Sequence, residues 1–380
     1  MARTDVQGAV EGGSPRIVAK FGSKLLTSDG GQLDAAVLAD LVRQVAALAA
    51  DGAQVAVVTS GAVALGRDRL AVPHLQRDIA DRQVLAAIGQ SRLVERYDTL
   101  LHEHGLMAAQ ALLTRADLAQ RGGYLNARNT IDALLRLGVV PIINENDVVA
   151  DEELRGGAFG ENDSLSALVA NLIDADLLVV LSDVDGLFRS DPRTDPRAEL
   201  IRDVEDIDAV ADYAGPPGRG GRGGMRAKVE AARLATGTGT TVVVANGREP
   251  DALRRIVGGE ALGTRFWPGS THTESRKRWL LSGLGAGAGR FVIDAGAVRA
   301  LRHNSRSLLP VGVVEVRGDF ERGDIVAVEG AGGERLAVGI SNYGAEEASQ
   351  IRGRRSDRIE ELLGYYYGDE MIHRDNLVLL

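Results

Sequence analysis

Between residues 16 and 265, short apolar runs rich in β-branched residues alternate with alanine- and leucine-rich stretches. The apolar runs include RIVAKF, QVAVV, VVPIIN, LLVVLS and TTVVVAN. Apolar strands that alternate with helical stretches are typical of a mostly parallel sheet covered on both faces. The pattern therefore predicts an α/β domain over residues 16–268, with a mostly parallel sheet sandwiched by helices.

Small, polar or charged residues follow four of these predicted strands. Ligands of such sheets bind at the carboxyl ends of the strands, so we expect these residues at one rim. The four groups are Lys20, Gly22 and Ser23; Thr59, Ser60 and Gly61; Asn144, Glu145, Asn146 and Asp147; and Ser182, Asp183 and Asp185.

The rest of the chain differs from this α/β region. Residues 1–15 carry acids and lack an apolar core, so we interpret them as a disordered leader and not a secretory signal. Residues 269–289 contain a basic cluster and then SGLGAGAG, which predicts a linker. Residues 290–370 alternate strand-like runs with Gly-Asp turns, which predicts a small β-rich domain.

Composition excludes several kinds of chemistry. The chain has no cysteine, which excludes disulfides, thiol nucleophiles and Cys-based zinc sites. Its six histidines are scattered without metal-ligand spacing. A net charge of −9 does not favour binding to a polyanion, so phosphate binding requires a local basic patch. No apolar run is long enough to span a membrane, and we expect a cytoplasmic protein.

Each candidate motif has a structural interpretation as well as a functional one. Lys20 and Gly22 in KFGS could bind an anion, or lie on the surface at a strand end. Ser60 in TSGA could bind a carboxylate or phosphate, or cap a helix. The amides and acids of PIINEND could bind an amino acid, or form a turn. Asp163 in ENDS could orient lysines or a metal, or cap a helix.

The stretch GPPGRGGRGGMRAKVE, residues 215–230, allows three interpretations: a linker, an RGG-type RNA-binding tail, or a phosphate-binding loop. It lies inside the α/β region, which argues against a linker, and it lacks the aromatic repeats of an RGG tail. We therefore predict a mobile loop in which Gly223 and Gly224 close over phosphates. Lys228 then follows one turn into a helix that begins near Met225.

Taken together, six motifs in this order resemble the amino-acid kinase family, and within it the glutamate-kinase branch. They are KFGSKLLT, VTSGAVALG, PIINENDVVA, FGENDSLSALVANL, LSDVDGLF followed by RSDPR, and GGMRAKV. The later segment SRSLLPVGVVEVRGDFERGDIV is similar to the PUA domain that many members carry. The resemblance extends over roughly residues 16–370.

The resemblance implies ATP-dependent phosphorylation of the γ-carboxylate of L-glutamate, as the first step of proline synthesis, with Mg²⁺ and with feedback inhibition by proline. It implies catalytic roles for Lys20, Lys228 and Asp163. It implies glutamate binding by Ser60, Gly61, Asn144, Asp147 and Asn162. It also implies ATP binding by Lys20, Gly22, Ser182, Asp183, Arg222, Gly223, Gly224, Met225 and Lys228. Arg222 departs from the small hydroxyl residue of the family pattern, and no metal ligands are assigned.

Two other functions stay open at this stage. A family member could use another acceptor, such as carbamate, aspartate or uridylate, although the asparagine- and aspartate-rich segments favour an amino acid. An RNA-binding protein is the second, because PUA domains often bind RNA. Residues 286–380 hold 12 Arg against 15 Asp and Glu, a net charge of −3, which argues against RNA. We also expect a homo-oligomer.

Overall fold

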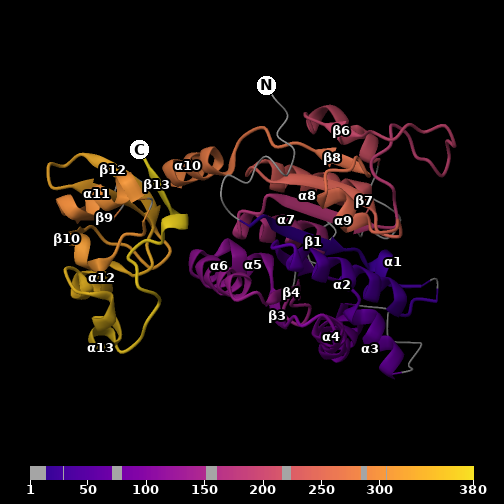
Figure 1. Cartoon of the computed structure of the whole chain (residues 1–380), viewed down its shortest axis with the longest axis horizontal. Helices are drawn as coiled ribbons and strands as arrows, with labels where there is room; N and C mark the ends of the chain where they lie inside the picture. Colours follow the sequence, from indigo (N-terminus) through magenta and orange to yellow (C-terminus); the bar gives the residue numbers. More distant parts are fainter. Residues whose placement is uncertain are drawn as a thin grey trace. The chain divides into compact units, whose positions relative to one another are not determined.

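The computed structural model describes residues 14–28, 30–70, 79–150, 161–215, 224–283, 289–304 and 306–380. The chain divides into two compact units, one of residues 1–118 with 127–271 and one of residues 119–126 with 272–380. Each unit has its own β-sheet (Figure 1).

The sheet of the first unit has eight strands in the order β3-β4-β2-β1-β5-β7-β8-β6. The neighbours from β3 to β7 all pair in parallel, whereas β8 is antiparallel to β7. The predicted α/β fold with a mostly parallel sheet is confirmed. The strands are β1 (Arg16–Phe21), β2 (Gln54–Val58), β3 (Ala108–Leu113), β4 (Val140–Glu145), β5 (Leu177–Ser182), β6 (Asp203–Val204), β7 (Thr241–Asn246) and β8 (Thr264–Phe266).

The register brings the carboxyl ends of the central strands to one edge. Lys20 of β1 lies opposite Val58 of β2 and Val180 of β5. Because these strands run in parallel, the residues that follow them leave the sheet on the same side. The predicted rim of polar residues therefore exists.

Helices cover both faces of this sheet (Figure 1). Leu41 of α2, Leu93 of α4 and Leu253 of α9 are buried in one core with the residues of β1 that face them. Helices α7 and α8 pack against β1, β5 and β7. The helices labelled in this region are α1 (Ser23–Leu26), α2 (Ala35–Ala50), α3 (Ala62–Leu70), α4 (Ile79–His102), α5 (Arg115–Ala119), α6 (Arg121–Arg136), α7 (Glu161–Leu172), α8 (Met225–Thr236) and α9 (Ala252–Val257).

Helices α3 and α4 contact each other backbone to backbone. A Cβ atom added at Gly66 would lie 1.9 Å from the carbonyl oxygen of Leu85, and one at Gly89 would lie 1.8 Å from that of Ala62. Both positions therefore require glycine, because any side chain would force the helices apart. The two helices form one tightly packed pair beside the ends of β2 and β4.

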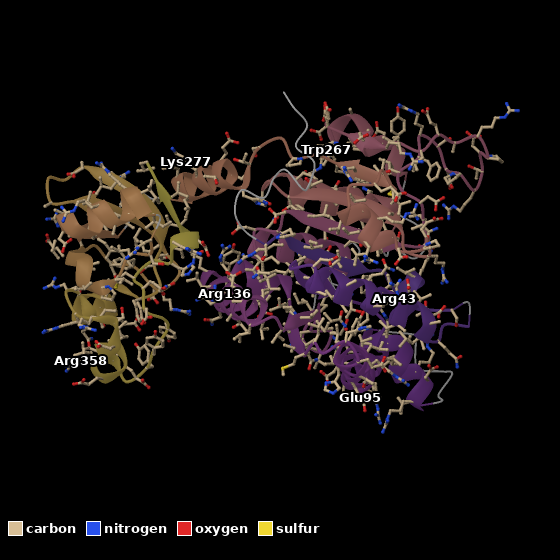
Figure 2. The ribbon with its side chains drawn as sticks, viewed as in Figure 1. Arg43, Glu95, Arg136, Trp267, Lys277 and Arg358 are labelled. Carbon is tan, nitrogen blue, oxygen red and sulfur yellow. The ribbon has the colours of Figure 1, made fainter. Side chains whose placement is uncertain are left out.

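The outward faces of these helices carry charged side chains (Figure 2). Arg43 of α2 forms ion pairs with Asp40 at 2.6 Å and Asp251 at 2.7 Å. Glu95 of α4 pairs with Arg92 at 2.6 Å. The division between an apolar inner face and a charged outer face explains why these segments form surface helices of the domain.

The second unit contains a five-stranded sheet in the order β10-β9-β11-β12-β13. Its core includes Phe291 and Phe320, whose rings meet edge to face with centroids 5.5 Å apart. The predicted β-rich domain is confirmed. Its elements are β9 (Arg290–Ile293), α11 (Ala295–Asn304), β10 (Val313–Arg317), β11 (Ile325–Gly330), β12 (Arg335–Ile340), α12 (Ala345–Ile351), α13 (Ile359–Leu363) and β13 (Leu377–Leu379).

Part of the predicted linker, residues 269–289, is helical. Helix α10 spans His272–Gly283 and includes the basic cluster around Lys277. The stretch HTESRKRWLLSG has several good helix formers and no proline, which explains the helix. The remaining residues 284–288 lie outside the described residues, as do residues 1–13 of the predicted leader.

Within the described parts of the chain, no helix has both the length and the apolar character that crossing a membrane requires.

Candidate active site

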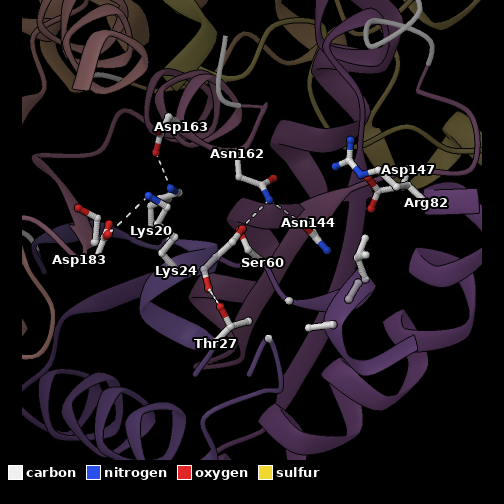
Figure 3. Close-up of a pocket in the computed structure, with 18 of the residues that line it drawn as sticks. Lys20, Lys24, Thr27, Ser60, Arg82, Asn144, Asp147, Asn162, Asp163 and Asp183 are labelled. Carbon is white, nitrogen blue, oxygen red and sulfur yellow. Dashed lines mark hydrogen bonds and ion pairs between the residues drawn. The ribbon is translucent and has the colours of Figure 1, made fainter. Parts of the chain in front are cut away.

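A pocket of about 440 Å³ lies at the carboxyl ends of β1, β2, β4 and β5 (Figure 3). Residues from the first turns of α7 and α8 also line it. Its lining residues are Lys20, Gly22, Ser23, Lys24, Thr27, Gly31, Ser60, Gly61, Ala62, Val63, Ala64, Arg67, Arg82, Asn144, Asp147, Asn162, Asp163, Ser182, Asp183 and Lys228. The pocket therefore combines all four predicted strand ends with two helix starts.

Asp163 lies between two buried lysines in this pocket. Its Oδ2 accepts a hydrogen bond of 3.2 Å from Lys228 Nζ, and its Oδ1 forms an ion pair with Lys20 Nζ. Asp163 is 1% exposed, and each lysine is 5% exposed. The three residues come from α7, β1 and α8, so this charge cluster ties together segments far apart in the sequence.

Burial and the pairing of opposite charges shift the pKa values of this cluster in opposite directions. Burial alone would raise the pKa of Asp163, but the ammonium groups of Lys20 and Lys228 together lower it. Burial lowers the pKa of Lys20, and the neighbouring Lys228 lowers it further, although Asp163 opposes both effects. With both lysines protonated the cluster has a net charge of +1, which suits an anionic ligand such as a phosphate.

A chain of hydrogen bonds holds the polar side chains beside this cluster. Asn162 Nδ2 donates to Ser60 Oγ at 2.9 Å and to Asn144 Oδ1 at 3.2 Å. Asn162 Oδ1 is buried and has no hydrogen-bond partner among the described residues. Buried polar atoms in folded proteins are almost always paired, so this oxygen is suited to accept a bond from a ligand.

After Ser60 the polypeptide backbone makes a tight turn into α3. Gly61 has a φ of +109°, a conformation that favours glycine. The turn places the start of α3 in the pocket wall, together with Asp147 from the end of β4. Figure 3 draws Asp147 and Arg82 at the opposite end of the pocket from Asp183.

The third group of residues surrounds the end of β5. The backbone N–H of Gly22 donates to the carbonyl of Leu181 at 2.9 Å, which ties the loop after β1 to β5. Ser182 Oγ is buried and unpaired among the described residues. Asp183 is partly exposed and lies 3.8 Å from Lys24 Nζ. These groups offer the hydroxyl of Ser182, the carboxylate of Asp183 and the ammonium group of Lys24 to a polar ligand.

Several predicted residues do not reach the pocket. Thr59 is buried and bonds the hydroxyl of Tyr97 at 2.6 Å, and Asp185 accepts from Asn246 at 2.9 Å. Glu145 and Asn146 do not line the pocket either. Gly224 and Met225 form the start of α8 but are not among the lining residues. Arg222 and Gly223 lie outside the described residues.

Three cationic lining residues were missed by sequence reasoning. Lys24 lies four residues after Lys20 in the same KFGSKLLT motif, so its proximity along the sequence could have indicated it. Arg67 and Arg82 come from α3 and α4, where nothing in the local pattern distinguishes them from surface arginines. Arg67 Nε is buried without a hydrogen-bond partner among the described residues, which only the structure reveals.

The described residues include no group of three or more His, Cys, Asp or Glu side chains that could hold a metal ion. Asp163 is already paired with two lysines, so Asp183 is the carboxylate at the β5 end of the pocket with an exposed oxygen. Such a site suits Mg²⁺ that arrives on a nucleotide, because Mg²⁺ is commonly bound by one or two carboxylates plus substrate phosphates.

The family model described as "Amino acid kinase family" matches residues 15–246, and the model described as "PUA domain" matches residues 289–363. The first match covers more than half of the chain and shows that it belongs to the amino acid kinase family. Curated relatives named "Glutamate 5-kinase" are 48% identical in Dehalococcoides mccartyi (strain CBDB1), 49% in Herpetosiphon aurantiacus and 47% in Deinococcus radiodurans. These alignments cover 96% of this chain and 98%, 98% and 100% of the three relatives. The chain belongs to the glutamate 5-kinase family.

A solved UMP kinase from Bacillus anthracis is 17% identical, with a TM-score of 0.46 over 68% of this chain and 98% of its own. That similarity is too low to support any conclusion about the substrate. The family assignment rests on the family models and the curated relatives.

Proposed function

We propose that this chain transfers the γ-phosphoryl group of ATP to the γ-carboxylate of L-glutamate. The products are γ-glutamyl phosphate and ADP, and the reaction is the first step of proline biosynthesis. The observation that carries the proposal is the Asp163 carboxylate held between Lys20 and Lys228, next to the polar chain of Ser60, Asn162 and Asn144. The first group suits a phosphoryl group in transfer, and the second suits an amino acid.

Phosphoryl transfer requires positioning and positive charge more than covalent help from the protein. A carboxylate oxygen of glutamate attacks the γ-phosphorus, and the bond from that phosphorus to the β,γ-bridging oxygen breaks. The leaving ADP keeps that electron pair. No general base is needed, because the glutamate carboxylate is already ionised near pH 7. Lys20 and Lys228 stabilise the charge on the phosphoryl oxygens, and Asp163 orients both ammonium groups.

The acceptor subsite contains both kinds of group that an amino acid requires. The hydroxyl of Ser60 and the backbone at Gly61 offer donors to a carboxylate, while Asp147 and Asn162 Oδ1 offer acceptors to an ammonium group. Asn144 supports this arrangement through its bond with Asn162. A carboxylate can also accept hydrogen bonds from the ribose hydroxyls of a nucleotide, so the test below includes UMP as an acceptor.

The nucleotide subsite is proposed at the β5 end. Gly22 allows close approach of the phosphates to the backbone, and Ser182 and Asp183 face the same space. Mg²⁺ bound to the phosphates would be shared with Asp183 and would neutralise charge on them. We assign the predicted loop residues Arg222, Gly223, Gly224 and Met225 to the same subsite as a proposal that rests on the family resemblance.

Feedback inhibition by proline is part of the proposal. Proline carries an α-carboxylate and an ammonium group like glutamate, so it can use the same donors and acceptors, but it has no side-chain carboxylate to phosphorylate. Inhibition should therefore compete with glutamate and not with ATP. The predicted homo-oligomer stays a prediction.

The test is a coupled assay of ADP release with glutamate as the acceptor. We expect ADP release that depends on glutamate, and we expect hydroxylamine to trap the product as a γ-hydroxamate. Aspartate, carbamate and UMP serve as alternative acceptors, and proline is added at several glutamate concentrations. Absence of turnover with glutamate, or faster turnover with another acceptor, would overturn the proposal.

A further inference from the structure

Gln90 on α4 is buried beside the pocket but does not line it. It is 8% exposed, and its Oε1 accepts a hydrogen bond of 2.8 Å from Asn144 Nδ2. Asn144 in turn accepts from Asn162, which also donates to Ser60. Gln90 is therefore the outer end of a continuous chain of hydrogen bonds that reaches the acceptor subsite.

Each bond in this chain has a direction, because an amide has one donating and one accepting end. In the structure Gln90 Oε1 accepts from Asn144, while Gln90 Nε2 is buried without a hydrogen-bond partner among the described residues. With Gln90 in this orientation, Asn144 has its Nδ2 toward α4 and its Oδ1 toward the pocket. Asn144 Oδ1 can only accept, so it fixes Asn162 with its Nδ2 toward Asn144 and Ser60. The orientation of the Gln90 amide thus determines that of Asn144, which in turn determines that of Asn162.

The direction matters where the chain ends. Ser60 Oγ already accepts a bond from Asn162, so its own proton is available for a ligand. Asn162 Oδ1 is turned away from that bond and is buried without a partner among the described residues. The series of hydrogen bonds therefore leaves a donor at Ser60 and an acceptor at Asn162 for the ligand. An anionic carboxylate and a cationic ammonium group of one ligand match these two atoms in that order.

The packing of α4 keeps Gln90 at a fixed distance from this chain. The preceding residue, Gly89, contacts the backbone of α3 so closely that no side chain fits there. Tyr97 lies seven residues after Gln90 on the same face of α4, and its hydroxyl forms a hydrogen bond with Thr59 at the end of β2. One rigid helix thus supports the ends of both β2 and β4.

We infer that Gln90 is a positioning residue that sets the hydrogen-bond polarity of the acceptor subsite, an inference that rests on the proposed function. Without its accepting oxygen, Asn144 can rotate its amide, and Asn162 loses the constraint that presents Oδ1 to the ligand. Ser60 is then free to donate to Asn162 instead of to the substrate. The loss should fall on glutamate binding and leave ATP binding unchanged.

Two variants of similar length separate this role from packing. Gln90→Met fills the space but removes the accepting oxygen, and leaves the buried Asn144 amide without its partner. Gln90→Glu keeps an acceptor in either protonation state. We expect Gln90→Met to raise the KM for glutamate about tenfold or more, with the KM for ATP within about twofold of wild type. Gln90→Glu should restore a glutamate KM close to wild type.

Thermal unfolding of each variant is measured alongside the kinetics. If Gln90→Met does not fold, Gln90→Asn replaces it, because the shorter asparagine side chain cannot reach Asn144. An unchanged glutamate KM in Gln90→Met would overturn the inference about Gln90. It would not affect the proposed function, which is tested by glutamate turnover of the wild-type enzyme. Equal losses for glutamate and ATP, or no difference between the Met and Glu variants, would also overturn it in favour of a packing role. A wild-type enzyme without glutamate turnover would overturn both.

Discussion

Replacing Asp163 by asparagine keeps the shape of the side chain but removes the carboxylate between Lys20 and Lys228. At 3.2 Å, a unit charge pair is worth about 5 kcal/mol at an effective dielectric constant of 20. Breaking a buried pair by removing one partner costs about 3–5 kcal/mol, because the other charge stays buried. We therefore expect Asp163→Asn to lower the free energy of unfolding by about 3–5 kcal/mol at pH 7, which lowers Tm by roughly 6–20 °C.

The loss should depend on pH in a definite direction. The pKa of Asp163 is lower in the folded chain than in the unfolded chain, so its contribution to stability is complete above the unfolded pKa, near 4. That contribution is lost as the pH falls through the folded pKa. The Tm difference between wild type and variant should thus be constant from about pH 5 to 7 and shrink below about pH 4.

The assay is thermal unfolding from pH 3 to 7, with and without Mg-ATP. ATP should raise the Tm of Asp163→Asn more than that of wild type, because its phosphates neutralise the two lysines in place of the carboxylate. Asp183→Asn is the matched control, since its carboxylate lies in the same pocket but is partly exposed, and it should change stability by no more than about 0.5 kcal/mol. A Tm of Asp163→Asn within about 1 °C of wild type at pH 7 would refute the reasoning.

Three further outcomes are expected. Lys228→Ala should lower kcat by about 10²–10³ and leave the glutamate KM nearly unchanged in the ADP-release assay, and a kcat near wild type would remove Lys228 from the proposed role. Because burial lowers the pKa of Lys20, kcat/KM for ATP should decline with rising pH well below the ordinary lysine pKa near 10.4. A profile that is flat to pH 10 would contradict this. Gly89→Ala should destabilise the chain by about 1–3 kcal/mol in chemical denaturation, whereas Gly122→Ala, with no atom within 4 Å of the new Cβ, should be neutral or stabilising.

The sequence predicted the rim of the pocket well because strand ends are a local signal. Lys20, Ser60, Asn144 and Ser182 each follow an apolar run, and parallel strands bring such positions to one edge of the sheet whatever their distance along the chain. The start of α8 at Met225 was likewise predicted, because the glycines before it end where helix-forming residues begin.

The same local signal could not say which residue of a polar segment enters the pocket. Thr59 and Ser60 are adjacent, yet Thr59 turns to Tyr97 on a helix about forty residues away, and that partner is set by packing. Gln90 and Arg67 lie on helices whose buried faces are predictable but whose neighbours are not. The helical start of the linker was missed because a cluster of charges is compatible with both a helix and an extended segment.

The order of neighbouring strands β4-β2-β1-β5 in the sheet has a consequence for the path that the transferred phosphoryl group takes. The residues proposed for the acceptor lie at or after the ends of β4 and β2, Lys20 is the last residue but one of β1, and the residues proposed for the nucleotide lie near β1 and β5. Neighbouring strands lie about 4.8 Å apart, so in the proposed reaction the phosphoryl group travels across the strands, from the β5 side toward the β4 side. The axis of transfer is then a property of topology and not of any loop. A circular permutation that opens the chain far from this edge should preserve it, whereas exchanging two central strands would reverse or destroy it.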